Sequence, residues 1–290
     1  MTTTADSITA PRQGYMALPD LGSNEAGAIV YWRLAGSVDY EDLENAWRDA
    51  GLDDKLLPAP TTRPTALKRA MQTFKEPGVM VRKLKGEEVG FILVNETYAD
   101  GRPEYSRGME VTLDSSGSLA MAPHDDKLFA SVQATFAHHL NYLSQHDISS
   151  WLVDLARRAR AVRLRDTGGI YFVPKTSIAL WRAFTGALRL ASRNALFEIP
   201  ALHCDEAVAA ILDAITAEAD EACEAFTAEL DAKLDDMTAY SVRVRKARVE
   251  ELRAKIASYE ELLGVKMPAL TDQVQNIEAR LADAALRADG

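Results

Sequence analysis

The spacing of hydrophobic residues changes along the chain and predicts a series of short elements in its first part. Residues 28–34 are apolar, β-branched and aromatic, which predicts a strand. A helix is expected over residues 40–50, where Leu43 and Trp47 share one face and Asp39 is a suitable N-cap. A second helix is expected to begin at Pro64.

From residue 79 to about residue 121 the hydrophobic positions alternate with a period of two. The alternating segments are separated by turn-forming dipeptides, namely Lys85-Gly86, Asp100-Gly101 and Ser116-Gly117. This arrangement predicts an antiparallel meander. A helix over residues 125–145 is expected to follow it.

The next segment combines helical spacing with many arginines. A basic helix is predicted over residues 149–165, followed by a strand at residues 170–174 (IYFVP). A helix over residues 175–192 and a short strand at residues 196–199 complete this part of the chain.

After residue 205 the apolar residues recur at steps of three and four, which indicates helix almost to the end. Unbroken helix from residue 205 to residue 263 would form a rod about 87 Å long. Gly264 and Pro268 interrupt the pattern, which then resumes, so two helices could fold back as a hairpin or pair with another chain. Because no ordinary domain buries so long a rod, we expect a homo-oligomer that assembles through residues 205–290.

These patterns together predict an α+β fold: an antiparallel meander with packed helices, followed by a long coiled-coil-like helical extension. Three parts are expected. Residues 1–25 lack periodicity and are expected to be mobile, residues 26–204 form an α+β body with a basic surface, and residues 205–290 form an acidic helical hairpin or coiled-coil extension.

Charge is distributed unevenly along the chain. The net charge is −10, and residues 205–290 carry −9 of it, with 19 acidic and 10 basic residues. Residues 155–193, in contrast, hold nine Lys or Arg and a single acid, Asp166. A strongly basic segment next to a strongly acidic one says more about partners than the overall charge does.

Nothing in the sequence indicates a membrane or an exported protein. No apolar run approaches the roughly 20 residues that span a bilayer, and residues 1–13 do not resemble a signal peptide. Cys204 and Cys223 are too far apart along a helix to form a disulfide, which fits a reducing compartment. We therefore expect a cytoplasmic location.

Enzyme signatures are not found, so we expect neither catalysis nor a cofactor. The sequence has no nucleotide-binding glycine motif, no HExxH, no CxxC pair and no GxSxG. His138, His139 and His146 fit an amphipathic helix better than a metal site. The paired carboxylates of residues 205–290 fit a solvated helix face rather than a catalytic cleft.

The basic segment is the best candidate for a binding site. Arginine forks bind phosphates well, and interleaved aromatic rings can stack on bases. We therefore predict an interface for single-stranded nucleic acid that combines three groups: the arginines of the basic helix (Arg157, Arg158, Arg160, Arg163, Arg165), the residues that follow them (Tyr171, Phe172, Lys175, Arg182), and an extension on the meander (Arg82, Lys83, Lys85).

Two alternatives remain open from the sequence. The arginines could instead meet the acidic helix of the same or a neighbouring chain, since residues 205–236 hold eleven acids and one Lys. The protein could also be a coiled-coil scaffold or adaptor that acts through protein–protein contacts, with residues 205–290 as its working part. The first alternative does not exclude nucleic-acid binding, because an acidic segment can cover a DNA groove while DNA is absent.

The order of the elements resembles the single-stranded-DNA-binding RNA polymerase cofactor (Drc) family of lytic Pseudomonas phages. The segments that carry the resemblance are residues 30–36 (VYWRLAG), Ala46-Trp47, Gly51-Leu52, residues 56–58, residues 66–70 (ALKRA), residues 168–174 and the helical tail. The resemblance implies a fold unlike the OB barrel and sequence-independent binding of single-stranded DNA. It also implies a phage RNA polymerase as partner at opened promoters, in the cytoplasm of a bacterial host.

Overall fold

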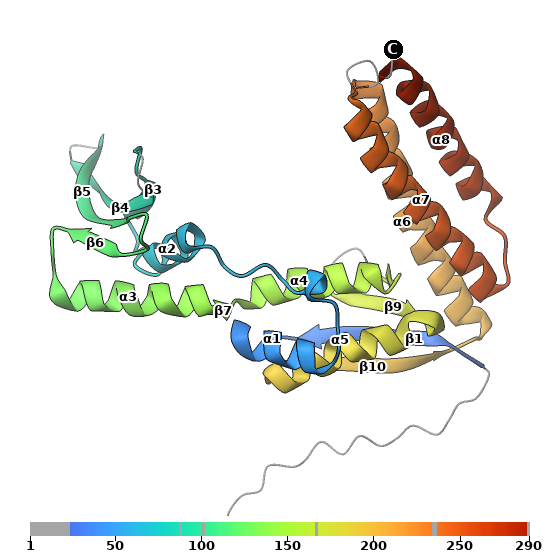
Figure 1. Ribbon diagram of the computed structural model, residues 1–290, viewed down its shortest axis with the longest axis horizontal. Helices are drawn as coiled ribbons and strands as arrows, with labels where there is room; N and C mark the ends of the chain where they lie inside the picture. Colours follow the sequence, from blue (N-terminus) through green and yellow to red (C-terminus); the bar gives the residue numbers. More distant parts are fainter. Residues whose placement is uncertain (1–23, 87–88, 100–101, 166–167, 234–236, 289–290) are drawn as a thin grey trace, which may run out of the picture.

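The computed structural model describes residues 24–86, 89–99, 102–165, 168–233 and 237–288. Of the segment expected to be mobile, residues 1–23 lie outside this part of the chain, as does the predicted turn at Asp100-Gly101. The fold is mixed α and β with antiparallel sheets, which confirms that part of the prediction. A meander at one end and a group of three helices at the other flank a central sheet (Figure 1).

The central sheet has the strand order β10-β1-β9-β8, with every pair antiparallel. Its strands are β1 (Glu25–Arg33), β8 (Val162–Arg163), β9 (Ile170–Pro174) and β10 (Ala195–Leu202). Residues 28, 30, 171 and 173 turn their side chains to one face, where the core also includes Trp47, Leu152 and Phe184. Three helices cover this face of the sheet: α1 (Tyr40–Asp49), α4 (Gln145–Arg158) and α5 (Ile178–Ala191).

The predicted meander is confirmed as a four-stranded sheet in sequence order. Its strands are β3 (Val79–Lys83), β4 (Val89–Ala99), β5 (Arg102–Leu113) and β6 (Leu119–Ala122). Alternate residues such as Phe91 and Val111 point to one face, where Leu67 of α2 (Arg63–Gln72) and Phe136 of α3 (Asp126–Asn141) bury them. The period of two follows from this one-sided burial.

The helix expected over residues 125–145 ends early, at Asn141. The chain then forms β7 (Tyr142–Leu143), which pairs with β2 (Val38–Asp39), and α4 starts directly afterwards. Ser144 caps α4 in a capping box with Asp147, and this competes with continuation of α3. His139 and His146 therefore lie on two different helices.

The predicted rod over residues 205–263 is wrong. The chain instead forms three separate helices, which we call the bundle: α6 (Asp205–Lys233), α7 (Ala239–Leu263) and α8 (Pro268–Ala288). Thr238 caps α7 by accepting a bond from the Ser241 amide, and Gly264 ends it with φ of 67°. The apolar stripes bury one another: Leu230, Val249, Tyr259 and Leu281 are fully buried. The long exposed stripe that led us to expect a homo-oligomer through residues 205–290 is therefore not present, and that oligomer stays an untested prediction.

An ion pair joins the meander end to the central sheet. Arg69 of α2 donates from both terminal nitrogens to Asp147 of α4, at 2.8 and 2.7 Å. The Ser144 hydroxyl donates to the same carboxylate at 2.7 Å. Burial raises the pKa of Asp147, but the bonds from Arg69 and Ser144 outweigh that effect and lower it to about 2. Deprotonated Asp147 therefore stabilises the folded state.

We predict that Asp147→Asn lowers the free energy of unfolding by about 2 kcal/mol at pH 7. The pKa of Asp147 is lower in the folded state, so its contribution is present above its unfolded pKa of about 4. It is lost as the pH falls toward 2. Urea unfolding of both proteins at several pH values measures this, and the difference between them should shrink between pH 4 and pH 2.

Asp154→Asn is the matched control for this prediction. Asp154 is on the same helix and pairs with Arg157, but both side chains are largely exposed, at 63% and 70%. Such a surface pair is expected to contribute less than about 0.5 kcal/mol. Equal effects of the two substitutions at pH 7 would contradict the role given to Asp147.

Candidate nucleic-acid interface

The predicted basic helix over residues 149–165 is in fact a helix, a tight turn and an edge strand. α4 ends at Arg158, and Arg160 takes the left-handed conformation with φ of 55°. The Arg160 amide donates to the Arg157 carbonyl and the Ala161 amide to the Ala156 carbonyl, which is a Schellman motif. Glycine usually occupies the left-handed position of this motif, so an arginine there does not indicate the end of a helix.

Side chains of the bundle hold this turn in place. The buried Tyr259 hydroxyl of α7 donates to the Arg160 carbonyl at 2.8 Å. Lys255, one turn earlier, donates to the Ala161 carbonyl at 2.7 Å and to Glu218 at 2.6 Å. Burial raises the pKa of Tyr259 far above its ordinary value, so the hydroxyl keeps its proton and remains a donor. The contacts explain how a non-glycine residue is kept at a left-handed position.

The five arginines that border the turn are all exposed. We call Arg157, Arg158, Arg160, Arg163 and Arg165 the arginine row. Arg157 pairs with Asp154 at 3.0 Å, and Arg163 pairs with Glu221 of α6 at 3.4 Å. Both pairs are on the surface, where such contacts contribute little. The other three side chains form no ion pair with the described residues.

The acidic helix does not cover the arginine row. Within the described residues, Glu221 is the single acid of α6 that pairs with it. Other acids of α6 pair inside the bundle: Glu229 with Arg245 at 3.1 Å, Glu218 with Lys255, and Asp231 with Arg280. The alternative in which the acidic helix of the same chain neutralises the row is therefore realised for one arginine of the five.

The two aromatic residues expected to stack on bases are not available for stacking. Tyr171 is 9% exposed and Phe172 is fully buried. β9 is an interior strand, so one face lies under α4 and α5 while the other lies under the bundle. Tyr171 stacks on Trp32, and Phe172 packs edge-on against Tyr259. The prediction that these rings form a base-stacking platform is wrong.

The remaining predicted residues are dispersed. Lys175 is exposed in the 3-10 helix η3 (Lys175–Ser177) and borders a pocket of about 460 Å³ together with Arg160. Arg182 of α5 is bound by Glu198, with its Nε 3.0 and 3.2 Å from the two carboxylate oxygens.

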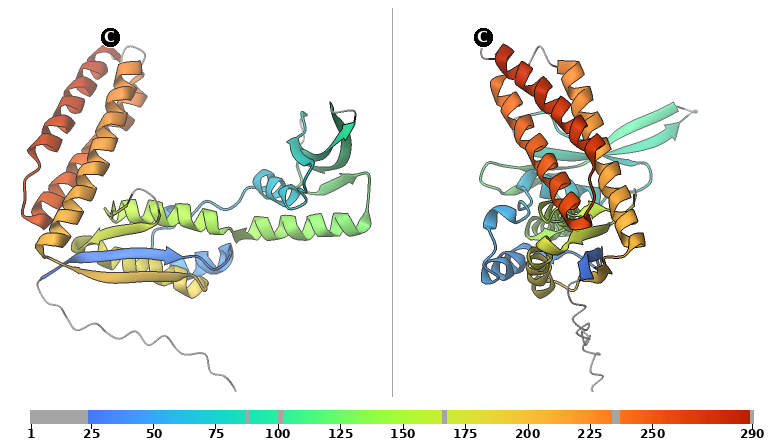
Figure 2. Two further views of the ribbon diagram at one scale, coloured as in Figure 1. Left: turned by 180° about the vertical axis from the view of Figure 1, so that it is seen from behind. Right: turned by 90° about the vertical axis from the view of Figure 1, so that its right-hand side faces the viewer.

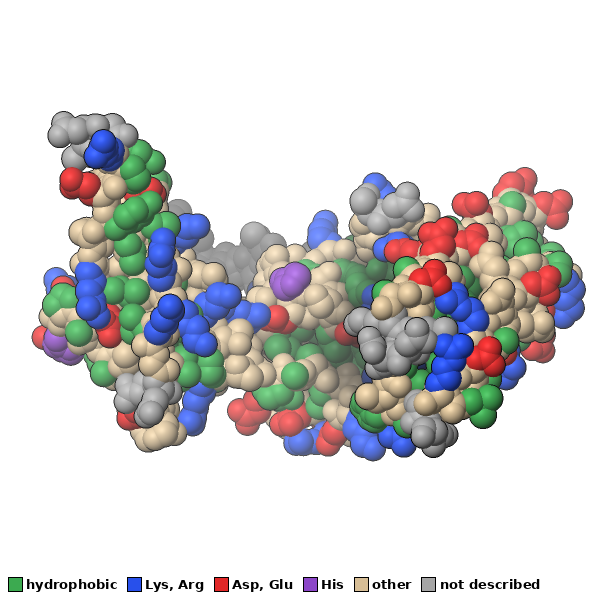
Figure 3. Space-filling view, turned by 90° about the horizontal axis from the view of Figure 1, so that it is seen from above, with side chains coloured by type: hydrophobic (Ala, Val, Ile, Leu, Met, Phe, Trp, Pro, Cys, Tyr) green, Lys and Arg blue, Asp and Glu red, His purple; other side chains and the backbone are tan. Residues whose placement is uncertain are grey.

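The meander residues of the prediction lie far from the arginine row. Arg82 and Lys83 lie on β3, and Lys85 follows them, at the end of the molecule opposite the bundle (Figures 1 and 2). They therefore do not extend the row. Seen from above, basic side chains are prominent on the meander end, whereas acidic and basic side chains mix on the bundle end (Figure 3).

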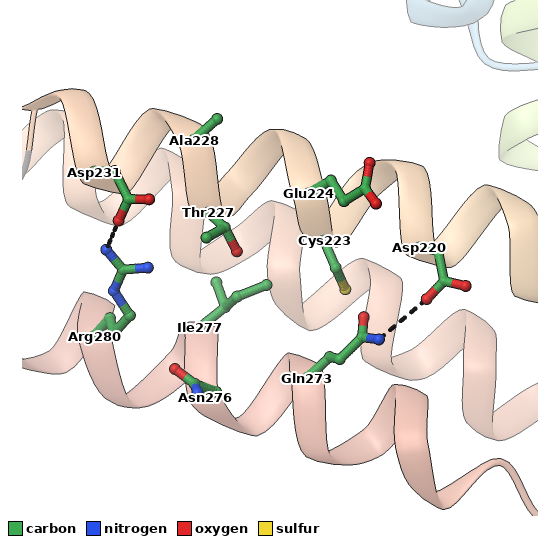
Figure 4. Close-up of a pocket in the computed structure, with 10 residues that line it drawn as sticks. All are labelled: Asp220, Cys223, Glu224, Thr227, Ala228, Asp231, Gln273, Asn276, Ile277 and Arg280. Atoms are coloured by element: carbon green, nitrogen blue, oxygen red, sulfur yellow. Dashed lines mark hydrogen bonds and ion pairs between the residues drawn. The ribbon is translucent and has the colours of Figure 1, made fainter.

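A second groove, of about 460 Å³, runs between α6 and α8 (Figure 4). Gln273 donates to Asp220 at 3.1 Å across it, and Arg280 bonds to Asp231. Cys223 lies at its base, where burial raises the pKa of the thiol. Within the described residues, no group of three His, Cys, Asp or Glu side chains could hold a metal ion.

These features define a mixed α/β protein that presents an exposed cluster of arginines. None of its described helices is long and apolar enough to cross a membrane. The chain belongs to DUF6744, a family of unknown function whose model matches residues 26–290. Searches of curated proteins and of solved structures found no match.

We predict that Tyr259→Phe lowers the free energy of unfolding by about 1 kcal/mol, because the Arg160 carbonyl loses its donor. It should also speed hydrogen exchange at the Arg160 and Ala161 amides. Denaturant unfolding and exchange mass spectrometry measure the two effects. Tyr240→Phe is the matched control, since Tyr240 is on the same helix but 69% exposed. Unchanged exchange at the turn would contradict this role of Tyr259.

Proposed function

We propose that this protein binds single-stranded nucleic acid and that the arginine row contacts its phosphates. One observation carries the proposal: five guanidinium groups within nine residues are all exposed. Arg158, Arg160 and Arg165 form no ion pair with another described residue. Lys175 adds an exposed positive charge at the pocket that Arg160 borders, which Glu25 and Glu261 also line.

Electrostatics supports a polyanion as the ligand. Like charges held this close repel one another, and a phosphate chain relieves the repulsion at several arginines together. Guanidinium forks match phosphate oxygens with two parallel bonds. The fixed turn brings the charges together before the ligand arrives, which reduces the entropy cost of binding.

The shape of the row favours a single strand over a duplex. The arginines project from a helix end, a turn and an edge strand, so they follow a bent path rather than one helix face. A duplex reader typically places a helix or a β-ribbon in the major groove, and this arrangement offers neither. A flexible single strand can follow a bent path.

The Drc resemblance supports DNA as the polynucleotide and a phage RNA polymerase at opened promoters as the partner. We include both in the proposal. The scaffold alternative takes residues 205–290 as its working part, and in the bundle the apolar side chains of these residues bury one another. We therefore favour the nucleic-acid binder.

We predict that labelled oligo-dT binds with micromolar or tighter affinity at 50 mM salt and weakens steeply toward 200 mM. The triple variant Arg158→Ala, Arg160→Ala, Arg165→Ala should bind at least about tenfold more weakly. Its plot of log affinity against log salt should be shallower by about 2, since three phosphate contacts are lost. Fluorescence anisotropy across a salt series measures both quantities.

The triple variant Arg82→Ala, Lys83→Ala, Lys85→Ala is the matched control. It removes the same number of charges from the opposite end of the molecule and should change affinity little. Two results would contradict the proposal: equal losses in both triple variants, or wild-type binding that does not respond to salt. Duplex DNA of the same length should bind more weakly than the single strand.

A further inference from the structure

The central sheet has a second face that the three covering helices do not touch. Side chains alternate along a strand, so Ile29, Tyr31 and Arg33 of β1 point away from the core formed with α1, α4 and α5. The strand register places Tyr31 between Phe197 of β10 and Ile170 of β9. One row of this face is therefore apolar and aromatic across three strands.

The bundle covers only one end of this face. Val162, Phe172 and Ala201 belong to the core cluster that the bundle buries. Tyr31 and Phe197 do not belong to it and are partly exposed, and Ile199 of the edge strand is 50% exposed. In the left view of Figure 2, the bundle rises from one end of β1 (blue) and β10 (ochre), and no helix crosses in front of their other end.

Tyr31 and Phe197 form a stacked pair on this uncovered end. Their ring centroids are 4.7 Å apart and their planes differ by 14°. Each ring uses one face for the other, so a further flat group extends the stack by lying against an outer face. Phe197 lies on edge strand β10, and within the described residues no neighbouring strand lies beyond it. A nucleobase has the flat π-face that such a stack accepts.

Positive charge lies next to the ring pair and at the far edge of the sheet. Arg33 is exposed and follows Tyr31 on the same face. Arg163 and Arg165 lie on and just after β8, the opposite edge of the same sheet, which is two strands or about 10 Å from β1. The register pairs Arg163 with Tyr171, so its side chain leaves this open edge on the other face of the sheet. None of the described strand residues that the register places on this face is acidic.

We propose that the uncovered end of this face is where bases stack, with Tyr31 and Phe197 as the platform. The inference rests on the proposed function: the arginine row holds the phosphates at the β8 edge, and the strand then crosses the sheet toward β10. Arg33 meets a phosphate between the two. A sheet face with aromatic rings accommodates about two or three bases in other single-strand binders.

A second copy of this chain is a less suitable occupant. Pro200 in the middle of β10 has no amide hydrogen, which makes this edge a poor template for strand addition. The rings are also bordered by the exposed Arg33, and the cores of protein–protein interfaces are depleted in charge. The charges favour a polyanion.

Photocrosslinking tests the location of the bases directly. Oligo-dT carrying 5-iodouracil crosslinks to rings that stack on the modified base, and mass spectrometry of the wild-type protein identifies the residue. Crosslinks at Tyr31 or Phe197 are expected. Crosslinks confined to the exposed Tyr98 and Tyr105 of the meander would overturn the inference and leave the proposed function standing. Wild-type protein that binds no oligo-dT would overturn both.

Leucine substitutions separate stacking from charge. Tyr31→Leu with Phe197→Leu should weaken oligo-dT binding about tenfold while the salt slope stays unchanged, because no ionic contact is lost. Tyr98→Leu with Tyr105→Leu is the matched control and should bind like wild type. Circular dichroism melts verify that both variants fold. Light scattering that shows a smaller assembly for the first variant, with DNA affinity intact, would identify a subunit interface and overturn the inference.

Discussion

The arginine row depends on the hydrogen bonds that α7 makes to the turn after α4. Tyr259 and Lys255 donate to two successive carbonyls, those of Arg160 and Ala161, and keep the backbone left-handed at a position without glycine. This contact fixes the end of α4, where Arg157 and Arg158 lie. It also sets the direction in which the chain enters β8, which carries Arg163. The bundle is therefore a structural support of the basic surface, although Lys255 and Tyr259 lie 94 and 99 residues away in sequence from the carbonyls that they bind.

The division of charge along the sequence has a structural counterpart. Three acids of α6 pair with Arg245, Lys255 and Arg280 inside the bundle, so these carboxylates do not neutralise the arginine row. The row retains its positive potential although the protein has a net charge of −10. Local charge rather than net charge governs the approach of an anionic ligand at physiological salt, because the Debye length is only about 8 Å.

In the proposed mode of binding, a single sheet provides both the phosphate-binding and the base-stacking residues. In this mode, phosphates meet the arginines at the β8 edge, and bases stack toward the β10 edge on the face that the bundle leaves open. The rings that the sequence first suggests, Tyr171 and Phe172, instead build the two cores that hold β9 between α4 and the bundle. Their aromatic character contributes to stability rather than to binding.

The sequence by itself determined the elements that depend on local patterns. The meander follows from one-sided burial with a period of two, and Asp39 and Gly51 mark the ends of α1. Local patterns did not reveal the end of α4 at Arg158, because a partner helix stabilises that turn without glycine. Only the tertiary structure decided which rings are buried and which arginines remain exposed. Burial on both faces of β9 and the division of the predicted rod into three helices arise from contacts between residues far apart in sequence, which the spacing of neighbouring residues does not contain.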